Sequence, residues 1–174
     1  QSDDAPRVFQ LPLRVYYEDT DMAGIVYYAN YLRYIERGRS EWVREIGLDQ
    51  NRMKDVDGIV FAVRRVEADY IAPARLDDQL IVETWVESLG AARMIMGQRV
   101  TRGDTELFRA LVTVVCMTLE GRPVQIAAWQ FDVGGVADFK IPVVLLDTDL
   151  PENAEGDRSI THHLYGGDAR YRLL

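Results

Sequence analysis

The feature that most constrains the fold is one long amphipathic stretch between residues 28 and 46. Its apolar side chains recur at spacings of three and four, the period of one helix face: Tyr28, Tyr31, Leu32, Ile35, Trp42, Val43 and Ile46. Small Gly38 stands where this stripe would otherwise be interrupted, and Gly47 is well placed to end the helix. A helix of about five turns with a charged opposite face must bury its stripe against another element.

Strand-like segments lie on both sides of this helix. Residues 11–17 alternate apolar and polar side chains before it, and four further segments follow it at 62–71, 79–89, 93–101 and 107–120. Residues 102–105 predict a hairpin turn, and residues 49–58 predict a short helical turn closed by Gly58. This order predicts an α+β fold in which one antiparallel sheet wraps around one central helix. The sheet face away from the helix then needs cover, so we expect a dimer.

Composition excludes several classes of protein. With 174 residues, 48% of them hydrophobic, the chain can bury one good core. Its net charge of −8 argues against general nucleic-acid binding, and its apolar runs fall far short of the roughly 20 residues that cross a bilayer. The single Cys116 rules out an internal disulfide, and no signal peptide is recognisable. These features predict a soluble, cytoplasmic protein without membrane insertion.

Histidine is almost absent, which limits the catalytic mechanisms that the chain can use. His162 and His163 are the only histidines, so residues 1–127 contain none and cannot assemble a Ser-His-Asp or Cys-His device. The only lysines, Lys54 and Lys140, argue against a Schiff base. Catalysis in residues 1–127 would therefore use carboxylates, tyrosines and backbone donors.

An acidic stretch directly precedes the helix: residues 18–31 read EDTDMAGIVYYANY. Together with YIAPARLDD at 70–78, it resembles the hotdog-fold acyl-CoA thioesterases of the 4-hydroxybenzoyl-CoA thioesterase family, and most closely their Tol–Pal-associated group. The resemblance extends over about residues 10–127. It implies a hotdog thioesterase domain at residues 1–127, an acyl-CoA substrate, no cofactor and no metal. It also implies a homodimer or a dimer of dimers.

The resemblance assigns the reactive groups. The second aspartate of the motif is catalytic in the family and falls on Asp21, while the helix N-terminus, around the backbone N–H of Tyr28, is implied to hold the thioester carbonyl. Many relatives have histidine where this chain has Tyr28. Elementary chemistry agrees, because the positive end of a helix favours both an ionised carboxylate and an oxygen that becomes negative. Asp21 would either activate water or attack the carbonyl, and Gly24 allows close backbone approach.

Structural roles compete with these functional ones. Aspartate and threonine before a helix are common N-caps, and Asp19 and Thr20 are expected to serve the turn. Tyr31 lies on the apolar stripe, where it suits the core as well as a pocket. Glu36 is a possible second carboxylate, although a salt bridge with an arginine is the simpler role. The predicted substrate-binding residues, including arginines for the CoA phosphates, are Gly24, Val26, Tyr27, Tyr31, Val63, Arg64 and Arg93.

Residues 128–174 form a C-terminal extension outside the resemblance. Its last part, from VVLLDTD to the end, resembles a fragment of a bacterial α-glucan phosphorylase, without the lysine region that holds pyridoxal phosphate. Local patterns predict strands at 129–133 and 141–146 and a helix at 157–165. Because adjacent histidines point differently on a helix, no metal site is expected there. A fusion of this kind leaves a second class of function open, a non-catalytic hotdog module used for assembly or binding.

Overall fold

The computed structural model describes residues 7–90, 93–133, 136–145, 159–164 and 167–173. The chain divides into two compact units. The first contains residues 1–48, 63–88 and 95–114, and the second contains residues 49–62, 89–94 and 115–174. None of the helices in the described part of the chain is long and apolar enough to cross a membrane.

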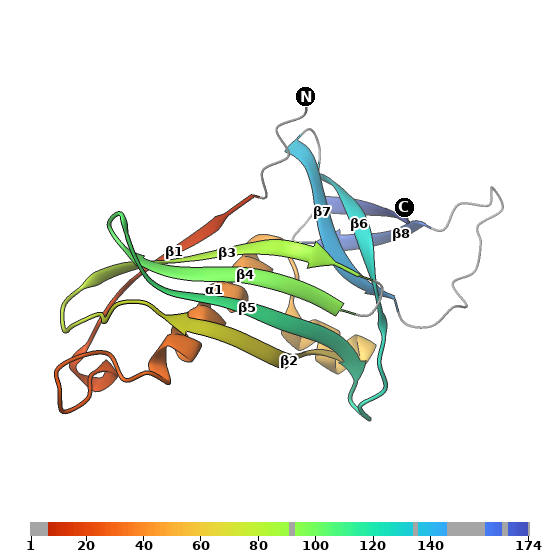
Figure 1. The fold of residues 1–174 in the computed structure, drawn as a ribbon. Coiled ribbons are helices and arrows are strands. Elements are labelled where there is room, and N and C mark those ends of the chain that lie inside the picture. Colours follow the sequence, from red (N-terminus) through yellow and green to blue (C-terminus); the bar gives the residue numbers. More distant parts are fainter. Residues whose placement is uncertain (1–6, 91–92, 134–135, 146–158, 165–166, 174) are drawn as a thin grey trace. The chain divides into compact units, whose positions relative to one another are not determined.

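A five-stranded antiparallel sheet forms the main layer (Figure 1). Its strand order is β1-β3-β4-β5-β2, so the two outermost strands are the ones that flank the helix in the sequence. The strands are β1 (Phe9–Arg14), β2 (Ile59–Tyr70), β3 (Gln79–Leu89), β4 (Arg93–Arg102) and β5 (Thr105–Thr118). The four strands predicted after the helix are confirmed. The first one is confirmed over Leu11–Arg14 only, because its pairing with β3 ends where Arg14 faces Gln79, the first residue of β3.

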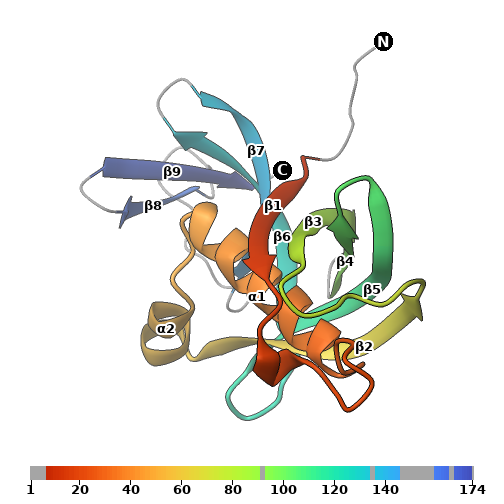
Figure 2. The same cartoon turned by 90° about the vertical axis from the view of Figure 1, so that its left-hand side faces the viewer.

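The helix α1 (Asn30–Glu45) lies along the inner side of this sheet, which curls around it (Figure 2). Gly47 ends it as predicted, with a positive φ of 84° that only glycine adopts freely. The Gly47 N–H donates to the Arg44 carbonyl, and the Leu48 N–H donates to the Val43 carbonyl. These two bonds close a Schellman motif, which satisfies carbonyls that the helix end would otherwise leave unpaired. The α+β arrangement expected from the sequence is therefore confirmed.

Helix α1 and the sheet approach each other closely at Gly38. A Cβ atom placed there would lie 2.8 Å from Val82 Cγ1 and 3.0 Å from Thr84 Oγ1. Beside it, the fully buried Gln98 donates to both the Ile35 carbonyl and Thr84 Oγ1, each at 2.8 Å, and accepts from Arg39 at 2.8 Å. The side chain of Gln98 is thus fully used to join α1 to β3 and β4. Polar groups buried here are satisfied, as buried polar groups must be.

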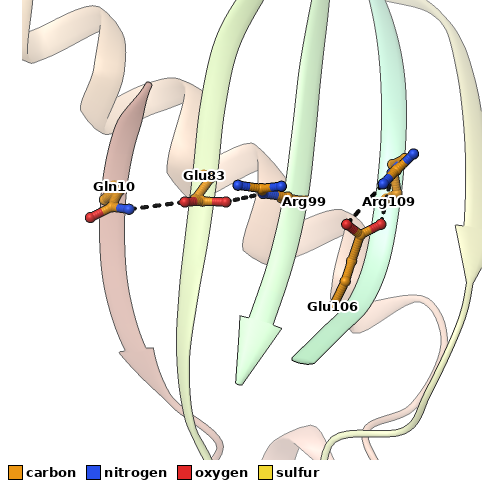
Figure 3. A network of polar contacts seen from close by, with 5 residues as sticks. All are labelled: Gln10, Glu83, Arg99, Glu106 and Arg109. Carbon is orange, nitrogen blue, oxygen red and sulfur yellow. Dashed lines mark hydrogen bonds and ion pairs between the residues drawn. The ribbon is translucent and has the colours of Figure 1, made fainter. Parts of the chain in front are cut away.

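The outer face of the sheet carries a row of polar contacts (Figure 3). Gln10 Nε2 donates to Glu83 Oε1 at 2.9 Å, and Arg99 forms an ion pair with the same carboxylate. Farther along, Arg109 makes two hydrogen bonds to Glu106, at 2.7 and 2.9 Å. Burial alone would raise the pKa of Glu83, but the hydrogen bonds from Arg99 and Gln10 outweigh it and lower this pKa. The row therefore holds a nearly buried carboxylate in its charged form.

Strand β2 is an edge of the described sheet and is unusually open. Residues 63–70 are exposed on both faces of the strand. The exposed apolar side chains among them are Val63, Val66 and Tyr70, while Arg65 pairs with Glu67 at 2.8 Å along the edge. A long edge strand with exposed apolar side chains is a surface that natural proteins normally cover.

The second unit adds a short helical segment and a small sheet. Helix α2 (Gln50–Arg52) and a π-helical turn, η2 (Met53–Asp57), end at Gly58, which has a positive φ of 67°, so the predicted helical turn is confirmed. A four-stranded sheet of order β7-β6-β9-β8 follows, built from β6 (Gln125–Val133), β7 (Val136–Leu145), β8 (Ser159–Leu164) and β9 (Gly167–Leu173).

Two predictions for the extension are confirmed and one is wrong. Strands β6 and β7 include the predicted strand residues 129–133 and 141–145, and residue 146 lies outside the described residues. The helix predicted at 157–165 is wrong over Ser159–Leu164, which pairs with β9 as β8. Ile160 and Thr161 are β-branched and suit a strand better than a helix. The boundary predicted between Ala127 and Ala128 falls inside β6, and it stays a prediction.

Candidate functional site

The predicted catalytic aspartate stands on a short hairpin, residues 20–26, which we call the Asp21 hairpin. Thr20 and Val26 form a bridge at its base, and the Asp21 N–H donates to the Ile25 carbonyl at 2.9 Å. The turn closes through the Gly24 N–H, which donates to the Asp21 carbonyl at 3.0 Å. Gly24 has a φ of 73°, so this turn favours glycine for its backbone conformation.

The carboxylate of Asp21 is exposed and held on one side only. Its Oδ1 accepts from the Ala23 N–H at 2.8 Å. Oδ2 makes no hydrogen bond within the described part of the chain. Asp21 does not cap α1, which begins nine residues later at Asn30. A carboxylate fixed through one oxygen and open at the other suits a general base or a nucleophile.

Asp19 has a different role, because it is buried with only 7% of its surface exposed. Its Oδ2 accepts from the Tyr16 N–H at 2.8 Å, which closes the 3-10 turn η1 (Tyr17–Asp19). Its backbone carbonyl accepts from the Tyr27 N–H and from the side chain of Asn30, both at 2.9 Å. Asp19 therefore serves the turn as predicted, and it also ties that turn to the start of α1.

The chain enters α1 through a turn at Tyr27–Asn30. The Asn30 N–H donates to the Tyr27 carbonyl, and Ala29 already has helical dihedral angles. The helix thus begins two residues later than the periodicity suggested. Among the hydrogen bonds of the described residues, the Tyr28 N–H has no acceptor. An unpaired N–H at this point is available to a ligand oxygen.

Aromatic side chains surround this turn. Tyr31 stacks on Phe108 with 5.1 Å between ring centroids, and Tyr70 meets both rings edge to face. The Tyr70 hydroxyl donates to the Tyr28 carbonyl at 3.0 Å. Tyr31 is buried, whereas 61% of Tyr28 is exposed. Tyr31 thus belongs to the core, and Tyr27 and Tyr28 present their rings outward.

The structure brings most of the predicted site residues together. Asp21, Gly24, Val26, Tyr27 and Tyr28 share the hairpin and the turn that follows it.

The others lie on separate elements. Val63 and Arg64 are exposed on β2, six or more residues from Tyr70, which is about 20 Å along a strand. Arg93, at the start of β4, belongs to the second compact unit. Glu36 accepts from the Ser40 hydroxyl at 2.6 Å and forms no ion pair among the described residues, so the expected salt bridge is absent there.

The sequence patterns did not identify the residues that hold the Asp21 hairpin in place. Asn30 bonds to the Asp19 carbonyl just before the hairpin, and the Ala74 carbonyl accepts from the Val26 N–H within it. Asp78 and Arg102 hold the segment that contains Ala74. The motif at 70–78 pointed to this segment, but no local pattern indicates which helix or strand it touches.

The fold and the hairpin define the class of protein. A curled antiparallel sheet around one central helix is a hotdog fold, and solved thioesterase structures match it. A probable thioesterase from Bartonella henselae is 37% identical, with a TM-score of 0.65 over 70% of this chain and 99% of that one. A mutant of 4-hydroxybenzoyl-CoA thioesterase, complexed with 4-hydroxybenzoyl-CoA, shares the fold with a TM-score of 0.64 and 24% identity over 68% and 92% of the two chains.

Sequence comparison gives the family. The chain belongs to the thioesterase-like superfamily, whose family model matches residues 15–147. The acyl-CoA thioesterase YbgC of Haemophilus influenzae is 40% identical over 111 residues, which are 64% of this chain and 82% of that relative. The acyl-CoA thioester hydrolase YbgC of Escherichia coli O6:H1 is 36% identical over 134 residues, 76% and 96% of the two chains. The fold and the enzyme class expected from the motif are therefore confirmed.

Proposed function

We propose that this chain is a cytoplasmic acyl-CoA thioesterase of the Tol–Pal-associated group, which hydrolyses a thioester to a free acid and CoA. One observation supports this most strongly. The Asp21 carboxylate is exposed on a hairpin just before α1 and is held through Oδ1 by Ala23. The named relatives are acyl-CoA thioesterases, and the chain spans 82% and 96% of their lengths.

In the proposed mechanism, the backbone N–H of Tyr28 donates to the thioester carbonyl and stabilises the negative charge that develops on its oxygen. Oδ2 of Asp21 takes part in the reaction in one of two ways. As a general base it takes a proton from water, whose oxygen attacks the acyl carbon. As a nucleophile it attacks that carbon itself, and water then hydrolyses the anhydride. Either route breaks the C–S bond, and the CoA sulfur leaves as a thiolate that takes up a proton.

Free-thiol release from acetyl-, butyryl-, benzoyl- and palmitoyl-CoA tests the activity. We expect turnover by the wild type and a loss of about a hundredfold or more in Asp21→Asn. Asp104→Asn is the matched control, because Asp104 is an exposed aspartate of another hairpin turn. Equal rates in the wild type and Asp21→Asn would refute the assignment of Asp21.

Labelled water separates the two routes. In a single turnover in H₂¹⁸O, a general base places ¹⁸O in the released acid. On the nucleophilic route, water that attacks the Asp21 carbonyl of the anhydride releases an acid with an unlabelled oxygen and leaves ¹⁸O in Asp21. A general base never labels Asp21, so ¹⁸O in the peptide that contains Asp21 identifies the nucleophile.

We further propose a homodimer in which β2 pairs with β2 of a second copy. Along this exposed edge the basic residues Arg64 and Arg65 come before the acidic residues Glu67 and Asp69. Because side chains alternate between the two faces of a strand, two copies related by a two-fold axis can pair only with the centre on a residue. An antiparallel pairing centred on Val66 would place each Arg65 opposite Glu67 of the other copy. Opposite charges directly across two strands stabilise the pair.

This pairing would also explain why two predicted binding residues, Val63 and Arg64, lie on β2 and away from the Asp21 hairpin of their own copy. In the same register, Val63 of one copy lies opposite Asp69 of the other, next to Tyr70, whose hydroxyl donates to the Tyr28 carbonyl. Val63 and Arg64 would then border the Asp21 hairpin of the second copy, where a guanidinium suits the CoA phosphates. Arg93 is retained as a second phosphate-binding candidate.

Charge reversal tests the register by sedimentation equilibrium. Arg65→Glu is expected to weaken the dimer, and adding Glu67→Arg is expected to restore it. Arg33→Glu, at an exposed position of α1, is the control for net charge. A dimer unaffected by Arg65→Glu would exclude this pairing.

The extension supports a second candidate, a non-catalytic hotdog module in a chimeric chain. The observation behind it is the tail that resembles a phosphorylase fragment, although the family match continues past Ala127 to residue 147. A folded dimer without turnover on any acyl-CoA would favour this reading. Turnover gained by a shortened chain ending at Ala127 would show that the tail blocks the site.

A further inference from the structure

A single buried hydroxyl joins α1 to the segment between β2 and β3. The Ala74 N–H donates to Tyr31 Oη at 2.9 Å, and both residues are buried, with 3% of Tyr31 and none of Ala74 exposed. Burial raises the pKa of Tyr31 and keeps its hydroxyl neutral. Tyr31, expected from the sequence in the core or in a pocket, therefore also binds the backbone N–H of Ala74 in a loop far away in the sequence.

The same loop residue holds the Asp21 hairpin. The Ala74 carbonyl accepts from the Val26 N–H at 2.8 Å, and Val26 forms the bridge to Thr20 at the base of the hairpin. Ile25 forms a further bridge with Arg75. Through Ala74, the Tyr31 hydroxyl is thus connected by two successive hydrogen bonds to the strand that carries the hairpin. No other side chain of α1 makes a hydrogen bond to residues 71–78 in the described part of the chain.

The far end of the loop is anchored independently. Asp78 Oδ2 accepts from the Arg75 N–H at 2.8 Å and from Arg102 at 2.6 Å. The Val15 N–H donates to the Asp78 carbonyl at 3.0 Å. With Asp78 held by Arg102 at the end of β4 and by Val15 just after β1, the Ala74–Tyr31 bond is the contact that fixes the middle of the loop against α1.

We propose that Tyr31 is a positioning residue for Asp21, an inference that rests on the proposed thioesterase function. Its hydroxyl fixes Ala74, Ala74 fixes Val26, and Val26 fixes the hairpin that presents the carboxylate. Without the hydroxyl, the buried Ala74 N–H has no acceptor, and leaving such a group unpaired is costly. The loop then shifts or admits water, and the carboxylate moves away from the thioester.

Two tyrosine-to-phenylalanine variants on the same helix test this proposal. Tyr31→Phe keeps the ring that stacks on Phe108 and removes only the oxygen. Tyr34→Phe is the matched control, because Tyr34 Oη is also buried, has no hydrogen bond of standard geometry among the described residues, and interacts with Asp19 rather than with Ala74. We expect Tyr31→Phe to lower kcat by about ten- to a hundredfold with little change in KM, since small misplacements of reacting groups cost this much. Tyr34→Phe should leave kcat unchanged.

A double variant shows whether the effect acts through Asp21. If Tyr31 only positions that carboxylate, adding Tyr31→Phe to Asp21→Asn should not lower the remaining rate further. Independent, multiplicative losses in the double variant would overturn the positioning role. So would a Tyr31→Phe enzyme whose kcat matches that of Tyr34→Phe.

Amide hydrogen exchange tests the structural part without turnover. In Tyr31→Phe the Val26 and Asp21 amides should exchange at least tenfold faster than in Tyr34→Phe, because opening of the hairpin becomes easier. Unchanged exchange at these amides would refute the tether. A wild type that hydrolyses no acyl-CoA, yet shows this exchange pattern, would refute the proposed function and the catalytic role of Tyr31 while leaving the tether in place.

Discussion

Replacing Gly38 by alanine tests how closely α1 packs on the sheet. The added Cβ would lie 2.8 Å from Val82 Cγ1, whereas ordinary contacts begin at 3.4 Å, so helix and strand must separate by about 0.6 Å. Val82 is fully buried and β-branched, which leaves its side chain little freedom to rotate away. Thr84 and Gln98 crowd the same position, at 3.0 and 3.2 Å.

Two opposing effects set the magnitude. Alanine is favoured over glycine inside a helix by about 1 kcal/mol. Overpacking a tight core costs about 1–3 kcal/mol. Because three neighbours rather than one must move at Gly38, we take the upper part of that range and expect a net loss of about 1–2 kcal/mol. For a chain of this size, the corresponding fall in Tm is about 2–8 °C.

Urea unfolding of the wild type and Gly38→Ala measures this loss as a shift in midpoint at constant slope. A Val82→Ala background provides the internal check. Removing the Val82 methyl groups makes room, so Gly38→Ala should cost less there than in the wild type. If Gly38→Ala is as stable as the wild type, or more stable, helix propensity outweighs crowding and the close approach described above is wrong.

Three further predictions follow from the sheet. Arg99 holds the pKa of Glu83 below its ordinary value. The charged carboxylate therefore stabilises the fold at pH values above its ordinary pKa, and this contribution to the free energy of unfolding is lost as the pH falls through the lowered pKa. Glu83→Gln should make the free energy of unfolding fall less steeply as the solution is acidified. Burial raises the pKa of Cys116 to about 12, so iodoacetamide should leave this thiol unmodified until urea unfolds the chain. Gly97→Ala should quench or shift tryptophan fluorescence and lower Tm, because its Cβ would lie 2.2 Å from the Trp85 ring; an unchanged spectrum would mean that the ring does not lie there.

The fold could be predicted because its helices and strands are determined by patterns within short stretches of sequence. The apolar period of α1, the alternation along the strands, and Gly47 and Gly58 at two helical ends all follow from short stretches of sequence. The start of α1 was misplaced by two residues because Tyr28 continues the apolar period although it lies in a turn. The helix expected at 157–165 failed because an acidic start resembled an N-cap, while pairing with β9 determined the strand.

The site was only partly predictable because its supports come from distant parts of the chain. The motif located Asp21 and the glycine beside it. It also assigned Asp19 to the turn and Asp21 to the chemistry, but no pattern indicated that bonds to Tyr27 and Asn30 would bury Asp19 while Asp21 stays exposed. The bond between Tyr31 and Ala74 joins residues 43 positions apart, and no periodicity reports such a contact.

The backbone of Ala74 offers a way to redesign the enzyme. This residue has no exposed surface, and both of its peptide groups are engaged, by α1 on one side and by the Asp21 hairpin on the other. Because Ala74 is fully buried, a larger side chain there has to displace its surroundings, and the two backbone bonds are expected to shift with it. Under the proposed mechanism, libraries that vary the volume at Ala74 are therefore expected to move the Asp21 carboxylate in small steps and to change the substrate range without altering any proposed reactive group.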